Sequence, residues 1–148
     1  MAECIVFAGI QGAGKSTLFS KRFSDTHVRL NLDMLKTRNR ETVLLHACLS
    51  CEQSVVVDNT NPTAAQRQRY LQLASAAGFR TALYWFDTPV AIALERNATR
   101  TGRARVPDVA IRGTAAKLED PNPGAGWDKV YRVLTSGEVV DFIGEEHE

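Results

Sequence analysis

Short apolar runs alternate with longer amphipathic segments along most of the chain. The apolar runs have the length of strands and are rich in β-branched or aromatic residues, and they cover 4–8, 27–31, 54–57 and 79–86. The segments between them have the length and apolar spacing of helices, and they cover 15–23, 39–53, about 62–77 and about 89–100. Strands and helices that alternate in this way form βαβ units. The pattern therefore predicts an α/β fold in which helices flank a parallel β-sheet.

Two of the predicted helices carry more specific signals. Asn61 followed by Pro62 is typical of a helix cap with proline at the first helical position, and Gly78 ends the segment. In segment 39–53, the predicted buried face comprises Val43, Leu44, Ala47, Cys48 and Cys51. Beyond the fourth strand we expect an arginine-rich loop at 101–107, a helix at 108–118, a turn-rich connector at 121–126 and short strands at 129–134 and 138–142.

The composition is that of a globular protein, with 44% apolar and 24% charged residues. Because 148 residues is the size of one ordinary domain, we expect a single domain over 1–148. A net charge of +1 means that any basic surface is local. No run approaches the roughly 18 apolar residues that a membrane helix needs, and the N-terminus has no signal pattern. We therefore expect a cytoplasmic protein without membrane contact, while its oligomeric state stays open.

Residues 9–17, GIQGAGKST, match the phosphate-binding motif G-x-x-x-x-G-K-[ST] in full, between an apolar run and a helix. Glycines let backbone N–H groups turn inward around a phosphate, and the following helix presents its positive end to the same anion. Lys15 would supply a charge to the β- and γ-phosphates, and Ser16 a hydroxyl to Mg²⁺, which prefers oxygen ligands. We therefore expect ATP and Mg²⁺ as ligands, bound by Gly9, Gln11, Gly12, Ala13, Gly14, Lys15, Ser16 and Thr17.

Two carboxylates follow predicted strands at the edge where open α/β sheets bind ligands. Asp58 ends the buried run 54–57, and its expected role is to orient Mg²⁺ through water or to hold the acceptor side of the site. Asp33 follows the second strand and could accept the proton of an acceptor hydroxyl. Lys36, on the same helical face, could hold an acceptor phosphate. For either aspartate, the alternative is a helix cap or turn residue.

The segment 96–112 contains five arginines and a single acidic residue. Gly102 and Pro107 bracket a loop, about 100–107, that could fold over ATP as a lid. Arginines delivered in this way stabilise charge on the transferring phosphoryl group, and Arg96 and Arg100 are the expected ATP contacts. The alternative is an ordinary solvated basic loop.

Four separated segments resemble the kinase domain of the polynucleotide 5′-hydroxyl kinases of phages and animals. The phosphate loop is shared with many families. Residues 31–33, NLD, resemble the N-R-D motif whose aspartate is the general base, and 58–62, DNTNP, are very similar to the helix entry of the animal enzymes. Residues 96–100, RNATR, resemble the lid, whose second arginine contacts the ATP phosphates.

The resemblance implies the P-loop kinase fold with strand order 2-3-1-4. It implies Asp33 as the base, Lys15 and Arg100 on the phosphates, and the 5′-hydroxyl of a polynucleotide as acceptor. The chain departs from the family at Leu32, which replaces an arginine, and at Lys36, which stands where the phage enzyme has an arginine. The phosphatase module that accompanies many of these kinases has no counterpart in the 148 residues.

A nucleic-acid acceptor would need phosphate contacts, and Arg67 is the arginine that we assign to substrate binding. The full set of candidates for a substrate groove is Arg38, Arg40, Arg67 and Arg69, which could also be solvated helix residues. Two other functions stay open. One is a kinase for a small metabolite such as a sugar, nucleoside or antibiotic, and the other is a nucleotide-binding regulatory module without transfer activity.

Overall fold

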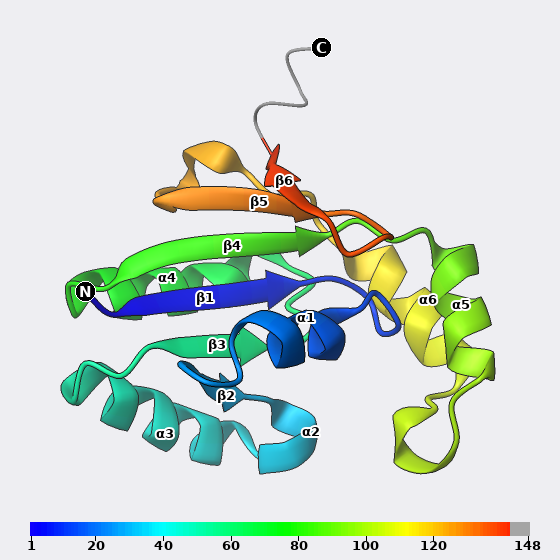
Figure 1. Cartoon of the computed structure of the whole chain (residues 1–148), viewed down its shortest axis with the longest axis horizontal. Helices are drawn as coiled ribbons and strands as arrows, with labels where there is room; N and C mark the ends of the chain where they lie inside the picture. The colour runs from blue at the N-terminus through cyan, green and yellow to red at the C-terminus, as the bar shows by residue number, and fades with distance from the viewer. Residues whose placement is uncertain (143–148) are drawn as a thin grey trace.

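The computed structural model describes residues 1–142, which form a six-stranded sheet with helices on both faces (Figure 1). The strands are β1 (Glu3–Ala8), β2 (Val28–Leu30), β3 (Val55–Asp58), β4 (Arg80–Phe86), β5 (Lys129–Val133) and β6 (Val139–Asp141). Their order is β2-β3-β1-β4-β5-β6, with β1 to β5 paired in parallel and β6 antiparallel to β5. The predicted parallel sheet and the implied order 2-3-1-4 are thus confirmed, and two further strands extend the sheet beyond β4.

Six helices and two short 3₁₀ turns connect these strands within the described residues. The helices are α1 (Lys15–Arg22), α2 (Leu32–Leu35), α3 (Arg38–Ser50), α4 (Ala64–Ala76), α5 (Val90–Ala98) and α6 (Asp108–Lys117). The 3₁₀ turns are η1 (Gly102–Ala104) and η2 (Pro123–Ala125). None of these helices is both long and apolar enough to span a membrane.

Successive side chains of β1 pack into two separate cores because a strand alternates its faces. Cys4 and Val6 belong to the core that α3 and α4 cover. Ile5 and Phe7 belong to the core on the other face, which receives side chains from α1, α5 and α6. β3 is buried along its whole length, as expected of an inner parallel strand.

The predicted start of the third long helix, expected at about residue 62, is wrong by two residues. Thr63, and not Asn61, caps α4, and Thr63 and Gln66 form a reciprocal capping box. Asn61 instead points inward with a φ of 41°, and its Nδ2 donates to the carbonyl of Phe7 at 2.7 Å. Asn61 therefore fastens the β3–α4 connection to β1.

The predicted buried face of the helix at 39–53 is also partly wrong. The buried residues of α3 are Glu41, Leu45 and Cys48, which are spaced by four and three residues. Of the five residues that we expected to be buried, only Cys48 is buried, and Val43, Leu44, Ala47 and Cys51 are exposed. The sequence pattern failed here because a glutamate, an unfavourable residue to bury, occupies the core-facing position.

The carboxyl ends of the parallel strands lie at one edge of the sheet (Figure 1). The loop after β1, the helix α2 after β2, and the loop after β3 all leave from this edge. The segment between α5 and α6 projects beyond these two helices toward the same side of the molecule (Figure 1). The fold thereby gathers the segments in which the sequence placed its candidate residues.

Candidate active site

A cleft of about 650 Å³ lies at the carboxyl edge of the sheet. Its walls come from the loop after β1, the start of α1, the β2–α2 segment, the β3–α4 loop and the segment between α5 and α6. From the predicted site, the cleft brings together Gln11, Gly12, Gly14, Lys15, Ser16, Asp33, Asp58 and Arg100. Gly9, Ala13, Thr17, Lys36, Arg67 and Arg96 are not among its lining residues.

The glycine loop adopts a backbone that other residues would not tolerate. Gly12 has a φ of 83°, and a Cβ at this position would lie 2.9 Å from the carbonyl oxygen of Ala93 in α5. Gly14 has a φ of 94° and immediately precedes α1. The loop is therefore pressed against α5, and the positive end of α1 faces the cleft that Gly14 and Lys15 line.

The ammonium group of Lys15 is enclosed by this loop. Its Nζ donates to the carbonyls of Gly9 and Ile10, both at 2.8 Å. Burial lowers the pKa of Lys15 from 10.5 to about 8; nearby Arg100 lowers it further, while Asp58 and Asp33 raise it. The charges of Asp33 and Arg100 therefore both act on Lys15, although the two residues come from segments far apart in the sequence.

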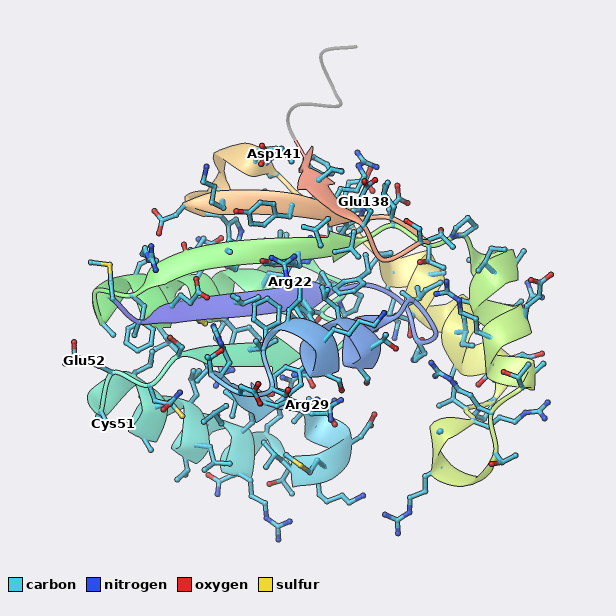
Figure 2. All side chains as sticks on the ribbon, in the orientation of Figure 1. Arg22, Arg29, Cys51, Glu52, Glu138 and Asp141 are labelled. Carbon is cyan, nitrogen blue, oxygen red and sulfur yellow. The ribbon has the colours of Figure 1, made fainter. Side chains whose placement is uncertain are left out.

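Asp58 and Ser16 are joined by Arg29, a residue that the sequence analysis did not single out. Asp58 is 2% exposed, and its Oδ2 accepts a hydrogen bond from Arg29 Nε at 2.8 Å. Arg29 Nη2 donates to Ser16 Oγ at 3.0 Å. The guanidinium of Arg29 lies beside α1 (Figure 2), 5.7 Å from the centre of the Phe19 ring. An arginine inside a three-residue strand was the only sequence signal for this role.

The donor set at this point fits magnesium. Ser16 Oγ and Asp58 Oδ2 each lie within 3.0 Å of a nitrogen of the same guanidinium, so the two oxygens are close to each other. Among residues 1–142, no three His, Cys, Asp or Glu side chains gather as a metal cluster. One hydroxyl and one carboxylate match the way Mg²⁺ is held in phosphate-transfer sites, where waters and substrate phosphates complete its ligands.

Asp33 is exposed at the second position of the short helix α2 and lines the cleft. Asn31 caps this helix: its Oδ1 accepts from the Met34 N–H at 3.1 Å, and its Nδ2 donates to the carbonyl of Asp58 at 2.7 Å. Asp33 is thus not itself the cap, which was the alternative role. Lys36 ends the helix with a φ of 78° and is exposed outside the cleft.

The predicted lid lies between α5 and α6 and contributes Arg100, Arg103, Ala104 and Val106 to the cleft. Asn97, which is fully buried, holds its two ends together. The Nδ2 of Asn97 donates to the carbonyl of Val106 at 2.7 Å, and its Oδ1 accepts from the Val106 N–H at 3.0 Å. The lid is therefore a closed loop that presents two arginines to the cleft.

Arg96 contacts the glycine loop from outside the cleft. Its Nη1 donates to the carbonyl of Gly12 at 3.0 Å, and its Nη2 donates to the carbonyl of Thr135 at 2.8 Å. Gln11 makes a second link of this kind, since its Nε2 donates to Thr114 Oγ1 of α6 at 3.1 Å. Arg96 therefore holds the glycine loop through its backbone and does not itself line the cleft, and its contact with ATP stays a prediction.

Arg67, which we expected to bind substrate, is a buried structural residue. It is 3% exposed, and its guanidinium donates to the backbone carbonyls of Asn61, Pro62 and Glu119. It also lies 5.2 Å from the centre of the Trp85 ring. All these contacts hold the β3–α4 connection against the segment after α6. The predicted role of Arg67 in substrate binding is therefore wrong, and its role is structural.

The sheet order, the glycine loop and the lid together define the P-loop kinase fold. A family model described as "AAA domain" matches residues 4–121, and the chain belongs to this family. The chain is 27% identical over 135 residues to a bifunctional polynucleotide phosphatase/kinase of Schizosaccharomyces pombe, covering 88% of this chain and 33% of that protein. It is 25% identical over 158 residues to an L-seryl-tRNA(Sec) kinase of Methanococcus maripaludis, and the match covers 93% of this chain and 61% of that protein.

Among solved structures, a gluconokinase from Sinorhizobium meliloti superposes with a TM-score of 0.63 at 19% identity, covering 92% of this chain and 84% of that one. This likeness supports the fold. The chain spans about a third of the length of the yeast relative and about three fifths of the archaeal one.

Proposed function

We propose that the chain is an ATP-dependent kinase that transfers the γ-phosphate to the 5′-hydroxyl of a polynucleotide. The observation that carries the proposal is the meeting of Asp33, Lys15 and Arg100 in one cleft, from three segments far apart in sequence. A nucleotide-binding module without transfer activity has no need for a carboxylate opposite the phosphate loop.

Each of these side chains has a role in the transfer step. The acceptor oxygen forms a bond to the γ-phosphorus, the bond from this phosphorus to the bridging oxygen of ADP breaks, and the hydroxyl proton passes to Asp33. Lys15 and Arg100 balance the negative charge of the phosphates during transfer. Magnesium, held by Ser16 and by Asp58 through water, would neutralise further charge on the phosphates.

The polynucleotide acceptor is supported by the similarity to a bifunctional polynucleotide phosphatase/kinase, and the similarity to an L-seryl-tRNA(Sec) kinase adds a substrate that is linked to RNA. Arg103 adds positive charge to the cleft wall, whereas the charge of Arg29 is offset by its ion pair with Asp58. An acceptor with a phosphate near its hydroxyl would meet the guanidinium group of Arg103.

One observation favours a small-metabolite kinase as the second candidate. The expected basic groove is depleted, because Arg67 is buried and Arg38 and Arg69 both lie near the carboxylate of Glu41, at 3.3 and 3.7 Å. Of the four arginines assigned to nucleic-acid contacts, this leaves Arg40, which donates to the carbonyl of Leu35 at 3.2 Å.

An acceptor panel with γ-labelled ATP tests the proposal. The panel contains DNA and RNA oligonucleotides with a 5′-hydroxyl, the same oligonucleotides with a 5′-phosphate, nucleosides and sugars. We expect label at the 5′ end of the first group alone. Labelling of nucleosides or sugars without labelling of oligonucleotides would establish the second candidate, and no labelling with intact ATP binding would favour the regulatory module.

A further inference from the structure

The helix that carries Asp33 is too short to hold its own shape. α2 has four residues, and an isolated helix of this length is unstable in water. Its orientation must therefore come from bonds to its surroundings. One of these bonds comes from Asn59, whose Oδ1 accepts from the Leu32 N–H at 2.9 Å, directly before Asp33.

The amide of Asn59 is in turn oriented by a buried carboxylate. Asn59 Nδ2 donates to Glu41 Oε2 at 2.8 Å, and Glu41 is fully buried. A carboxylate only accepts hydrogen bonds, so it holds the NH₂ end of the amide and leaves the oxygen for Leu32. The other oxygen of Glu41 accepts from the hydroxyl of Tyr70 at 2.6 Å and from Arg38 at 3.3 Å.

The same loop is fixed to the phosphate-binding side of the cleft. The Gly9 N–H donates to the carbonyl of Thr60, the residue after Asn59, at 2.9 Å. Asn59 therefore connects two parts whose relative position matters for transfer. One is the helix bearing Asp33, and the other is the loop that would hold the phosphates. Glu41 does not line the cleft, whereas its hydrogen-bond partner Asn59 does, which makes Asn59 the direct link from Glu41 to the cleft.

We propose that Asn59, held by Glu41, is a positioning residue that sets the direction of the Asp33 carboxylate toward the incoming hydroxyl. This inference rests on the proposed function, in which Asp33 is the base. It assigns a role to a buried glutamate on α3 that the transfer step itself does not explain.

The test is a double-mutant cycle between Asn59→Ala and Asp33→Asn in the full chain, with ATP and the 5′-hydroxyl oligonucleotide. Asn59→Ala should lower kcat by about tenfold or more while the Kd for ATP stays within about twofold, because the phosphate loop is untouched. In the Asp33→Asn background, Asn59→Ala should cost little further, because it acts through a carboxylate that is already gone. Asn59→Ser carries the same expectation if Asn59→Ala does not fold.

Tyr70→Phe is the matched control, because it removes a bond to Glu41 without touching Asn59. It should lower the melting temperature and leave kcat near that of the parent. Hydrogen exchange gives a direct readout: the amides of 32–35 should exchange faster in Asn59→Ala, with 15–18 unchanged. If Asn59→Ala lowered kcat by the same factor in the parent and in the Asp33→Asn background, the positioning role would be wrong while the proposed function would stand. If Asp33→Asn kept the parent kcat, Asp33 would not be the base, and the positioning role would fail with it.

Discussion

Arg29 and Asp58 form an ion pair of 2.8 Å inside the cleft, and the same guanidinium reaches Ser16 at 3.0 Å. The two oxygens expected to face magnesium are therefore bridged by a cation of the protein itself. A magnesium ion held by Ser16 and, through water, by Asp58 would compete with the Arg29 guanidinium for these oxygens.

Arg29→Ala should destabilise the free protein and increase its response to magnesium. The loss leaves the buried Asp58 carboxylate without this partner, at a cost of roughly 1–3 kcal/mol. Because Mg²⁺ then enters without competition, MgATP should raise the melting temperature of the variant by more than it raises that of the parent. Thermal unfolding with ATP, with MgATP and without ligand measures both effects. An equal or smaller MgATP shift in the variant would show that Arg29 does not compete with the metal.

The pKa of Lys15 predicts how ATP binding depends on pH. Since burial lowers this pKa to about 8, the free protein loses the Lys15 charge as the pH rises above 8. ATP phosphates favour the charged form, so the affinity for ATP should fall above pH 8 by up to about tenfold per pH unit, with proton uptake on binding. Lys15→Arg keeps its charge at all these pH values. Calorimetric titrations of ATP between pH 7 and 9 should show weaker but pH-independent binding for this variant. If the affinities of the parent and of the variant fell in parallel with pH, the pH dependence could not be assigned to Lys15.

The lowered pKa of Lys15 also affects the stability of the folded protein. A favourable ion pair would stabilise the fold while Lys15 is charged, whereas burial of the charged Lys15 destabilises it. The folded-state pKa of about 8 lies below the ordinary 10.5, so burying the charged ammonium costs stability below pH 8. This cost should disappear as the pH rises from about 8 to 10.5. Lys15→Met should remove the rise, as measured by urea unfolding of the free protein across this range.

Arg67 should matter for stability and leave substrate binding unaffected. Arg67→Ala removes the donors to three backbone carbonyls and should destabilise the fold by on the order of 3 kcal/mol. Arg67→Lys cannot reproduce the planar set of donors and should recover little. Where enough folded protein remains, the KM for the oligonucleotide should equal that of the parent; a raised KM with unchanged stability would restore the original assignment to substrate binding.

Asn97→Ala tests whether the base of the lid must be fastened for transfer. The variant loses both bonds to Val106, so Arg100 is no longer delivered from a closed loop. We expect kcat to fall by about tenfold or more. Arg105→Ala, in the same segment but outside the cleft lining, is the control and should retain the parent rate. Comparable rates for Asn97→Ala and the parent would mean that the lid needs no fixed base.

The parts of the fold that local sequence determines were predictable. The glycine loop lies between β1 and α1 as expected, because strand, glycines and helix start are all encoded within about fifteen residues. The strand order, in contrast, came from the resemblance alone. Arg29, Glu41 and Asn97 could not be assigned from the sequence, because each bonds to segments that lie next to it only after folding. Arg67 was misassigned for the same reason, since its partners include Glu119, 52 positions away.

The bonds between Asn97 and Val106 separate the lid from the framework that carries it. A segment whose two ends are tied to each other can change in length and charge while α5 and α6 keep their places. The segment 98–105 should therefore accept insertions or changes of charge as a self-contained unit, without moving the helices that press against the glycine loop.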